Sequence, residues 1–305
     1  MKLQKMRPPL RYAGGKTRAV KILAAHMPPD VKEMSSIFCG GLSFELYCEN
    51  ELGIKVNKAY DFNPLLVNLY NVLKTPENAQ RMVDDLLAEA GVSNGYNKEL
   101  YKKHYNAYKE YSKQIKSGGV ITANPYQMAL DFYVTHEFSR FVSPPYNYSD
   151  YTNKHEHLFK AKLKKLLDFK TNMQFECAHF KDSIPRHNTE FLYLDPPYFK
   201  DNKNLSTDLY FGHNTFNHVL LADLIKAHKS KFLMSYNDCE WVREAYKDFN
   251  IKVVEWRYSL RLGISKNRSD GEYNRHQKSY EVIISNYDWN ECGRQNTLIW
   301  WLYNA

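Results

Sequence analysis

Long hydrophobic runs are absent from this 305-residue chain. No apolar stretch approaches the roughly 20 residues that a membrane-spanning helix needs. The opening Met1-Lys2-Leu3-Gln4-Lys5 lacks the apolar core of a secretory signal peptide. We therefore expect an intracellular protein without a membrane partner. The hydrophobic fraction of 43% still allows one large globular domain, or one domain that carries an insertion.

Cysteine is scarce, and its spacing carries no metal or disulfide signature. The five cysteines are Cys39, Cys48, Cys177, Cys239 and Cys292. Their number is odd, they are scattered, and no two of them form a C-x-x-C pair. This pattern excludes a disulfide framework and a zinc site, so we expect reduced thiols and no bound metal.

Two glycine signatures of nucleotide-binding proteins are missing as well. Gly14-Gly15-Lys16 lacks the earlier glycine of a P-loop. Gly40-Gly41 follows a predicted strand but does not continue as G-x-G-x-x-G, which disfavours a dinucleotide site. Internal repeats and low-complexity segments are absent too.

Positive charge and aromatic residues, by contrast, are plentiful. The net charge is +8, the isoelectric point is about 9.0, and 24 tyrosines raise the aromatic fraction to 15%. A basic chain suggests a polyanionic partner, although many basic proteins bind none. The aromatic residues suit base stacking and core packing equally.

The segment Asp195-Pro196-Pro197-Tyr198 follows four apolar residues, Phe191–Leu194, that predict a strand buried on both faces. Two prolines end such a strand, because neither can donate a ladder hydrogen bond. Asp195 is then placed at the carboxyl end of the strand, where ligands bind in open α/β sheets. Its carboxylate and a rigid carbonyl beside it could accept both hydrogens of a planar amino group, with Tyr198 as a stacking face. The alternative is an ordinary turn at the end of a strand.

Three features nearer the N-terminus predict a cofactor site. Lys16 projects a cation from the Gly14-Gly15 bend, although a surface turn would look the same. A strand, the Gly40-Gly41 turn and a helix starting near Ser43 form a unit that brings backbone amides to a ligand. A second strand ends in Asp61, 20 residues after Gly41, the separation typical of an acidic residue that binds ribose hydroxyls. Asp61 could instead cap the helix that Asn63-Pro64 opens.

Residues 76–150 interrupt this α/β pattern with helices and a loop, and we interpret them as an inserted subdomain. One predicted helix places Tyr101, Tyr105 and Tyr108 on one face and distributes its lysines around the others. The lysines indicate either a solvated face or contact with phosphates, for which Arg140 and Tyr146 in the following loop are further candidates. Near the C-terminus, strands predicted at 253–260 and 280–285 enclose a second basic loop. Its candidate phosphate contacts are Lys266, Arg268 and Arg275.

The motifs and their order along the chain resemble those of the Dam-type DNA adenine-N6 methyltransferases, the α-type or D12 class. Their pattern is closest to that of the T-even phage Dam enzymes. The matching segments are Tyr12-Ala13-Gly14-Gly15-Lys16, Phe38 to Ser43, Asp61, His179-Phe180-Lys181-Asp182 and Asp195-Pro196-Pro197-Tyr198. Residues 139–145 depart from the recognition hairpin usual in the family. The resemblance therefore does not name the DNA sequence that is recognised.

The resemblance implies a Rossmann-like α/β sheet of the S-adenosylmethionine-dependent methyltransferases, with helices on both faces. Residues 1–75 and 151–305 would form the catalytic domain, and residues 76–150 an inserted, mostly helical target-recognition domain. The implied activity is transfer of a methyl group from S-adenosyl-L-methionine to the N6 amino group of a flipped adenine in double-stranded DNA. We expect the protein in the cytoplasm of a bacterial cell or of a phage-infected host. It would belong to a restriction-modification pair or act alone.

The resemblance also implies roles for individual residues. The catalytic residues would be Asp195, Pro196, Pro197 and Tyr198. The cofactor-binding residues would be Tyr12, Lys16, Phe38, Gly40, Gly41, Ser43, Asp61 and Asp195, with Lys16 on the methionine carboxylate and Asp61 on the ribose. The DNA-binding residues would be Arg140, Tyr146, Lys266, Arg268 and Arg275.

Two other functions remain open from the sequence. One is a methyltransferase of the same fold that acts on RNA or on a protein amide. An aspartate rather than an asparagine at position 195 favours a nucleobase amine, and the large insertion favours duplex DNA. The other is a catalytically silent DNA-binding protein that keeps the fold.

Overall fold

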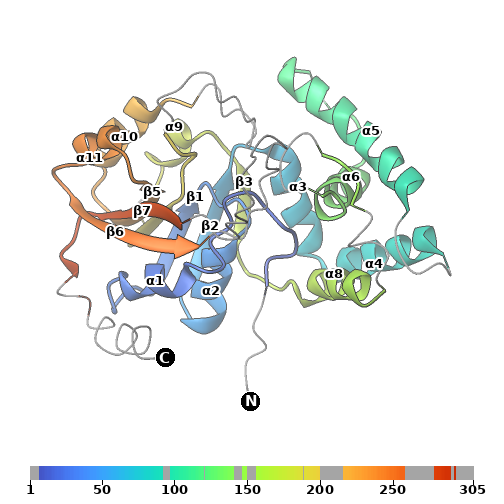
Figure 1. Ribbon diagram of the computed structural model, residues 1–305, viewed down its shortest axis with the longest axis horizontal. Coiled ribbons are helices and arrows are strands. Elements are labelled where there is room, and N and C mark those ends of the chain that lie inside the picture. The colour runs from blue at the N-terminus through green and yellow to red at the C-terminus, as the bar shows by residue number, and fades with distance from the viewer. Residues whose placement is uncertain are drawn as a thin grey trace, which may run out of the picture.

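The computed structural model describes residues 7–91, 97–119, 121–140, 146–149, 156–187, 189–199, 216–257, 278–289 and 292 (Figure 1). Lys266, Arg268 and Arg275 lie outside the described residues, as does the tail beyond residue 292. Within the described part, no helix has the length and apolar character needed to cross a membrane.

A seven-stranded sheet forms one half of the molecule (Figure 1). Its strands are β1 (Glu33–Ile37), β2 (Lys55–Asp61), β3 (Gln174–Cys177), β4 (Phe191–Leu194), β5 (Lys231–Asn237), β6 (Asn250–Arg257) and β7 (Lys278–Ser285). The spatial order is β3-β2-β1-β4-β5-β7-β6. Neighbouring strands from β3 to β5 are parallel, and β7 runs antiparallel to both β5 and β6. The predicted α/β fold and the predicted pairing of the last two strands are both confirmed.

Helices cover both faces of this sheet (Figure 1). The covering helices are α1 (Val20–Ala25) and α2 (Ser43–Glu51) on one face, and α9 (Phe180–Ser183), α10 (His218–Ala227) and α11 (Glu240–Ala245) on the other. Alternate residues of β4 serve the two faces, since Phe191 and Tyr193 join one apolar cluster and Leu192 and Leu194 the other. The strand is thus buried on both sides, as its composition predicts.

One helix is shorter than its sequence suggests. The apolar spacing predicts a helix over 241–249, but α11 ends at Ala245, and Tyr246 caps it. Tyr246 is fully buried beside Phe249, and its ring lies 6.1 Å from that of Tyr236 in β5. The chain therefore turns down onto the sheet at this point, and the apolar residues that extend the pattern belong to core packing.

The remaining helices form the other half of the molecule, between β2 and β3 in the chain (Figure 1). They are α3 (Pro64–Leu73), α4 (Pro76–Ala90), α5 (Lys98–Lys116), α6 (Pro125–Glu137) and α8 (Glu156–Asp168). Helix α3 packs against β2 and β3 on one side and against α6 on the other, while α4 packs against α8. One continuous apolar cluster joins Met82 and Phe132 of these helices to Met34 of β1. The division at residues 76 and 150 stays a prediction.

A buried charged network joins three of these helices. The His104 side chain in α5 is inaccessible to solvent, and its Nδ1 lies 2.6 Å from Oδ1 of Asp131 in α6. Its Nε2 lies 2.9 Å from Oε2 of Glu89 in α4, and the Tyr111 hydroxyl donates to Asp131 at 2.8 Å. Burial alone lowers the pKa of His104, but its hydrogen bonds to the two carboxylates outweigh burial and raise the pKa.

A second charged cluster surrounds Glu137 at the end of α6. The Arg11 backbone N–H donates to its Oε2 at 2.8 Å, and the ammonium groups of Lys162 and Lys165 lie 3.8 Å and 3.6 Å from its Oε1. The Arg11 guanidinium also donates to the carbonyl oxygens of His136, Glu137 and Ser139. Arg11 therefore ties the N-terminal segment to the helical half of the molecule.

Candidate active site

A cavity lies at the carboxyl ends of β1, β2, β3 and β4. Its empty volume is about 1020 Å³, open mouth included, which is large enough for a nucleoside-sized ligand. The lining residues lie in the segments 12–16, 37–45, 60–62 and 178–180, with Tyr193, Asp195, Pro197 and Phe216. The cavity thus gathers the N-terminal glycine segment, the Gly40-Gly41 turn, Asp61 and Asp195, which the sequence places far apart. Parallel strands bring these segments together, because all four strands end at the same edge of the sheet.

The floor of the cavity is a turn with unusual backbone geometry. Phe38 and Leu42 have φ angles of 67° and 58°, and Gly40 has a φ of 43°. The left-handed region is unfavourable for Phe and Leu, and such strain is concentrated at ligand sites. Tyr12 packs directly on the turn, so that a Cβ added at Gly41 would lie 3.1 Å from the Tyr12 Cβ. A side chain at position 41 would force Tyr12 to shift by a few tenths of an ångström.

Asp61 is held by the backbone on both sides of the cavity. Its Oδ2 accepts a hydrogen bond from the Gly40 N–H at 2.9 Å, and its Oδ1 accepts from the Asn63 N–H at 2.9 Å. The cap of α3 is Asn63, whose side chain accepts from Leu65 and Leu66, so capping is not the role of Asp61. Burial raises the pKa of Asp61, and the two backbone N–H donors oppose that rise. Its carboxylate lines the cavity in a fixed orientation.

Asp195 and Lys16 form a close ion pair in the same cavity. The Lys16 ammonium lies 2.6 Å from Oδ1 and 2.8 Å from Oδ2 of Asp195, and it also donates to the Gly14 carbonyl at 3.2 Å. Only 4% of the Lys16 side chain is exposed, against 19% of Asp195. The Tyr198 ring centroid lies 5.2 Å from the same ammonium. A contact between Lys16 and a cofactor carboxylate stays a prediction, since here the lysine neutralises Asp195.

Two residues of β5 hold the Asp195 segment, and sequence reasoning missed both. The Ser235 hydroxyl donates to Oδ1 of Asp195 at 2.9 Å. Asn237 pairs with Phe199 in both directions: its Oδ1 accepts from the Phe199 N–H at 2.9 Å, and its Nδ2 donates to the Phe199 carbonyl at 3.0 Å. Ser235 is fully buried. The sequence offers one signal, namely polar residues at the end of an otherwise apolar strand.

Glu45 is a third residue that sequence reasoning did not single out. It lies in the first turn of α2, lines the cavity and is 2% exposed. The Ser36 hydroxyl donates to its Oε1 at 2.5 Å. Burial raises the pKa of Glu45 to about 7, against the opposing effect of that hydrogen bond, and the nearby Asp195 carboxylate adds to the rise. A carboxylic acid thus lies beside the Asp195 carboxylate.

The other predicted cofactor residues also line the cavity. Ser43 begins α2, and its hydroxyl lies 3.0 Å from that of Thr17 in the N-terminal segment. The Phe38 ring contacts Phe180 and Phe216, with ring centroids 5.8 Å and 5.6 Å away. Phe62 remains 44% exposed at the mouth of the cavity beside His179. These rings provide flat apolar surfaces in the cavity wall.

The Asp195-Pro196-Pro197-Tyr198 tetrapeptide is only partly exposed to the cavity. Pro197 lines it, whereas Pro196 is buried beneath. Tyr198 is half-buried, and its ring stacks on Tyr236 at a centroid distance of 6.4 Å. The backbone beyond Tyr198 is held by Asn237, as described above. The Tyr198 ring therefore has a supported position next to the Asp195–Lys16 pair.

The two described candidates for DNA contact differ in exposure. Arg140 is exposed, and its backbone N–H donates to the Asn147 carbonyl at 2.6 Å. Tyr146 was expected in an exposed loop, and this is wrong: it is 8% exposed, and its hydroxyl lies 2.7 Å from Nε2 of His136. The ring packs against Tyr108 of α5 at a centroid distance of 5.6 Å. Tyr146 belongs to an aromatic core and cannot reach a DNA groove from this position.

The chemistry of the groups in the cavity wall fits S-adenosylmethionine, the cofactor that the resemblance implies. A carboxylate at Asp61, a cation at Lys16, aromatic faces at Phe38 and Phe180 and a glycine turn suit its ribose, carboxylate and adenine. Among the described residues, no group of three or more His, Cys, Asp or Glu side chains is placed to bind a metal ion.

Comparison with known proteins finds methyltransferases of similar sequence. The modification methylase StsI of Streptococcus sanguinis is 25% identical over 96% of this chain, which spans 44% of the length of StsI. The type II methyltransferase M.CviBI of Paramecium bursaria Chlorella virus NC1A is 24% identical over 92% of this chain and 100% of its own length. The DNA adenine methylase of Vibrio cholerae serotype O1 is 24% identical over 88% of this chain and 95% of its own length.

A family model matches residues 12–260, from the Tyr12 segment to the residues just beyond β6. This range contains every cavity-lining segment described above. The chain therefore belongs to the D12 class of N6 adenine-specific DNA methyltransferases.

Proposed function

We propose that this protein transfers the methyl group of S-adenosylmethionine to the N6 amino group of an adenine flipped out of duplex DNA. The observation that carries the proposal is the presence of Asp61 and Asp195 in one cavity, each at the end of a parallel strand. One carboxylate suits a ribose and the other an exocyclic amine. The proposal includes two further points. The motifs of the protein resemble those of the T-even phage Dam enzymes, and the protein acts in the cytoplasm.

The cofactor would lie along the floor of the cavity. Asp61 would accept hydrogen bonds from its ribose hydroxyls, and the rings of Phe38 and Phe180 would flank its adenine. Tyr12, Gly40, Gly41 and Ser43 would shape the surface between them. When bound, S-adenosylmethionine supplies an electrophilic methyl group on a positively charged sulfur.

Asp195 would accept a hydrogen bond from the target amine, together with the backbone carbonyl of Pro196. Both acceptors draw the nitrogen lone pair out of conjugation with the ring and direct it toward the cofactor. Ser235 holds Oδ1 of Asp195 at 2.9 Å, so that the carboxylate has one orientation. Catalysis would rest on positioning and electrostatics. The target adenine would stack on Tyr198, which offsets part of the few kcal/mol that unstacking costs.

Lys16 would have two anionic partners during this reaction. Its ammonium contacts both oxygens of Asp195. A cofactor carboxylate entering the cavity would compete for the same ammonium. Transfer of Lys16 to that carboxylate would release Asp195 for the amine, so cofactor binding would prepare the carboxylate for its substrate.

The proposal is tested by sequencing plasmid DNA for N6-methyladenine after expression in methylation-deficient cells, with Asp195→Ala as the inactive control. A single methylated adenine context in the wild-type sample supports the proposal and names the recognition sequence. If soluble wild-type protein leaves no modified adenine but methylates RNA or a protein amide, the substrate assignment is wrong. If it binds S-adenosylmethionine and methylates nothing, the silent DNA-binding alternative is favoured.

A further inference from the structure

Helix α5 carries a one-sided row of lysines that the cavity does not use. Successive residues of an α-helix advance by about 100°, which places five lysines within roughly a 60° sector of α5. We name this set the lysine stripe; it consists of Lys98, Lys102, Lys109, Lys113 and Lys116. All five are exposed. The expectation that Lys98, Lys102, Lys109 and Lys113 are spread around this helix is therefore wrong. Lys103 lies outside the stripe and pairs with Glu89.

The charge pattern of the lysine stripe differs from that of an ordinary solvated helix face. The stripe contains two like-charge pairs at i and i+4, an arrangement that destabilises a helix. These pairs are Lys98 with Lys102 and Lys109 with Lys113. Glu99 and Glu110 are nearby in sequence, yet no ion pair joins either to a lysine of the stripe among the described residues. Helix α5 therefore keeps positive charge that its own side chains leave available for an external anion.

Helix α8 is an internal reference for this comparison. Its exposed lysines are paired within the helix, with Lys160 bound to Glu156 at 2.5 Å and Lys164 bound to Asp168 at 2.8 Å. These are the i, i+4 pairs typical of a solvated face. The two helices belong to the same half of the molecule and have similar lysine contents, but only α8 neutralises its lysines locally.

The position of the lysine stripe relates it to the active site. Around the axis of α5, the face formed by Tyr101, Tyr105 and Tyr108 separates the stripe from the His104 network. That tyrosine face contacts the chain at 146–148, with 5.6 Å between the ring centroids of Tyr101 and Tyr148. Arg140 pairs with this segment through its backbone, and Arg11 reaches Ser139 from the residue next to Tyr12. The tyrosine face beside the stripe thus packs on the segment 146–148, and a series of contacts through Arg140, Ser139 and Arg11 connects that segment to the cavity.

We infer that the lysine stripe of α5 binds the phosphate backbone of the duplex that is methylated, an inference that rests on the proposed function. The stripe spans the 19 residues of α5, and its end residues lie about 27 Å apart along the axis, which corresponds to about eight base pairs of duplex. Lys109 is supported by the Tyr105 ring, whose centroid lies 5.0 Å from its ammonium. Lysine ammonium groups act as point charges toward phosphate and read no bases. The stripe therefore contributes affinity and orientation, and the same contribution for every sequence.

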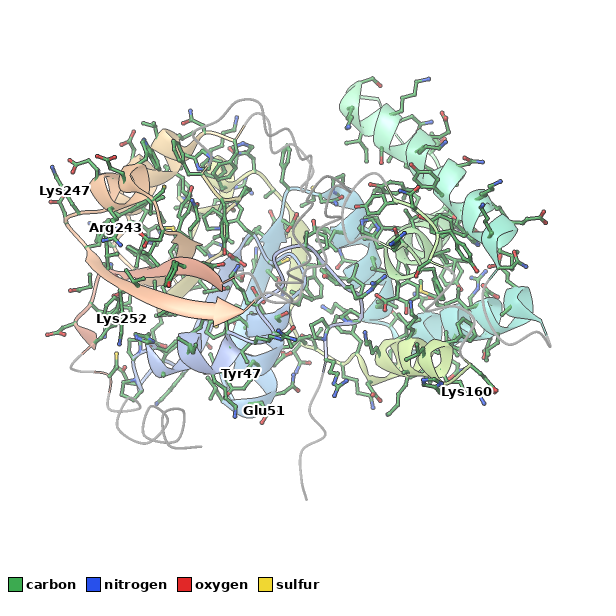
Figure 2. All side chains as sticks on the ribbon, in the orientation of Figure 1. Tyr47, Glu51, Lys160, Arg243, Lys247 and Lys252 are labelled. Atoms are coloured by element: carbon green, nitrogen blue, oxygen red, sulfur yellow. The ribbon has the colours of Figure 1, made fainter. Side chains whose placement is uncertain are left out.

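The test compares two triple variants that remove equal charge. The stripe variant carries Lys102→Gln, Lys109→Gln and Lys113→Gln, which remove three of the five charges of the lysine stripe. The control variant carries Lys160→Gln, Lys164→Gln and Lys252→Gln, which neutralise exposed lysines elsewhere. Figure 2 shows Lys160 at the lower right and Lys252 at the left, both away from α5 at the upper right. Binding of a short fluorescein-labelled DNA duplex is followed by anisotropy between about 50 and 200 mM salt.

We expect the stripe variant to bind at least about tenfold more weakly at low salt, and the slope of log K against log salt to fall by about 2 to 3 units. The loss should be equal for duplexes with and without the methylated sequence, and the control variant should keep the wild-type slope. An unchanged slope in the stripe variant, a loss confined to one sequence, or a loss confined to duplex RNA would overturn the inference. Equal melting temperatures of the variants exclude unfolding as the cause. Methyl transfer by the wild-type protein distinguishes a failure of this inference from a failure of the proposed function. If the wild type methylates no duplex, the proposed function is refuted instead.

Discussion

The two halves of this molecule use buried charge in opposite ways. In the sheet half, Asp61, Asp195 and Lys16 lie in the wall of a cavity and are held by backbone groups and short side chains. In the helical half, Glu137 and His104 are enclosed by partners that belong to the fold, and neither lines the cavity. Charges of the first kind line the cavity, whereas those of the second kind join segments of the fold to one another.

This difference indicates where each half performs its function. Buried polar groups of the sheet half act inside the molecule, at the ends of the parallel strands. The helical half pairs its buried charged groups His104 and Glu137 internally, and on the outside, along α5, it presents lysines that form no ion pair among the described residues. Substitutions in the first half should therefore change chemistry more than stability, and substitutions in the second half should do the reverse.

The largest effect is expected at Asp195. Replacement by asparagine keeps the size of the side chain but removes the negative charge that accepts from the amine, so turnover should fall about 1000-fold. Binding of DNA and of S-adenosylmethionine should change by only a few-fold. The measurement is single-turnover methyl transfer to a duplex, with the exposed Asp223→Asn in α10 as control. Near-normal turnover in the Asp195 variant would contradict the mechanism.

Glu137→Gln should reverse this pattern, because it leaves Arg11, Lys162 and Lys165 around a neutral group. Burial alone raises the pKa of Glu137, but the three cations outweigh burial and lower it. A lowered pKa stabilises the fold above the ordinary pKa of a glutamate, and this stability is lost as the pH falls through the folded-state value. The variant should therefore lose about 3 kcal/mol at neutral pH and little in acid.

Urea unfolding at several pH values measures this loss. Glu156→Gln, which removes one partner of an exposed pair in α8, is the matched control and should change the stability far less. A Glu137 variant that keeps its stability but loses turnover would break the distinction between the two halves.

Glu45 sharpens the comparison, because it is a buried acid of the sheet half whose pKa is raised to about 7. A raised pKa means that the folded state favours the protonated form, so its contribution to stability is complete in acid and is lost as the pH rises from about 4.5 to 7. Glu45→Gln should remove this dependence, changing the difference in stability between these pH values by about 2 to 3 kcal/mol. Thermal unfolding across the range tests it, with Glu51→Gln at the exposed end of α2 as control. Parallel pH profiles for wild type and the Glu45 variant would refute the assignment.

The smallest effect is expected at Ser235, which positions Asp195 without contacting substrate. Ser235→Ala should lower kcat about tenfold, with the KM for DNA and the Kd for S-adenosylmethionine almost unchanged. Ser235→Thr keeps the hydroxyl and should restore most of the loss. Ser35→Ala removes another buried strand hydroxyl, one with no hydrogen-bond partner among the described residues, and should leave kcat unchanged. An equal loss at both serines would indicate a packing effect.

Most elements of the sheet could be predicted from local pattern. The apolar run at Phe191–Leu194 followed by two prolines identifies both β4 and the place of Asp195. The spacing from Gly41 to Asp61 identifies the second carboxylate. Both inferences succeed because a strand end and the turn after it are set by neighbouring residues, and parallel strands bring their ends to one edge of the sheet.

The supporting residues could not be found in this way. Ser235 and Asn237 act on residues about 40 positions earlier, and the contact exists only because β5 pairs with β4 in a fixed register. The burial of Tyr146 depends on His136 and Tyr108, which tertiary packing brings to it. The lysine stripe, by contrast, could have been predicted from the helical spacing of the lysines in α5. It was missed because tyrosines are interleaved with these lysines in the sequence.

Arg11 has a practical consequence for exchanging recognition regions between relatives. Its guanidinium binds the carbonyl oxygens of residues 136, 137 and 139, and the next residue, Tyr12, lies on the Gly40-Gly41 turn. A graft that replaced residues 76–150 as a block would replace the backbone that carries all three acceptors, and would disturb the contact that supports the floor of the cavity. A transplant should therefore keep the end of α6 with the recipient and join the foreign segment before it.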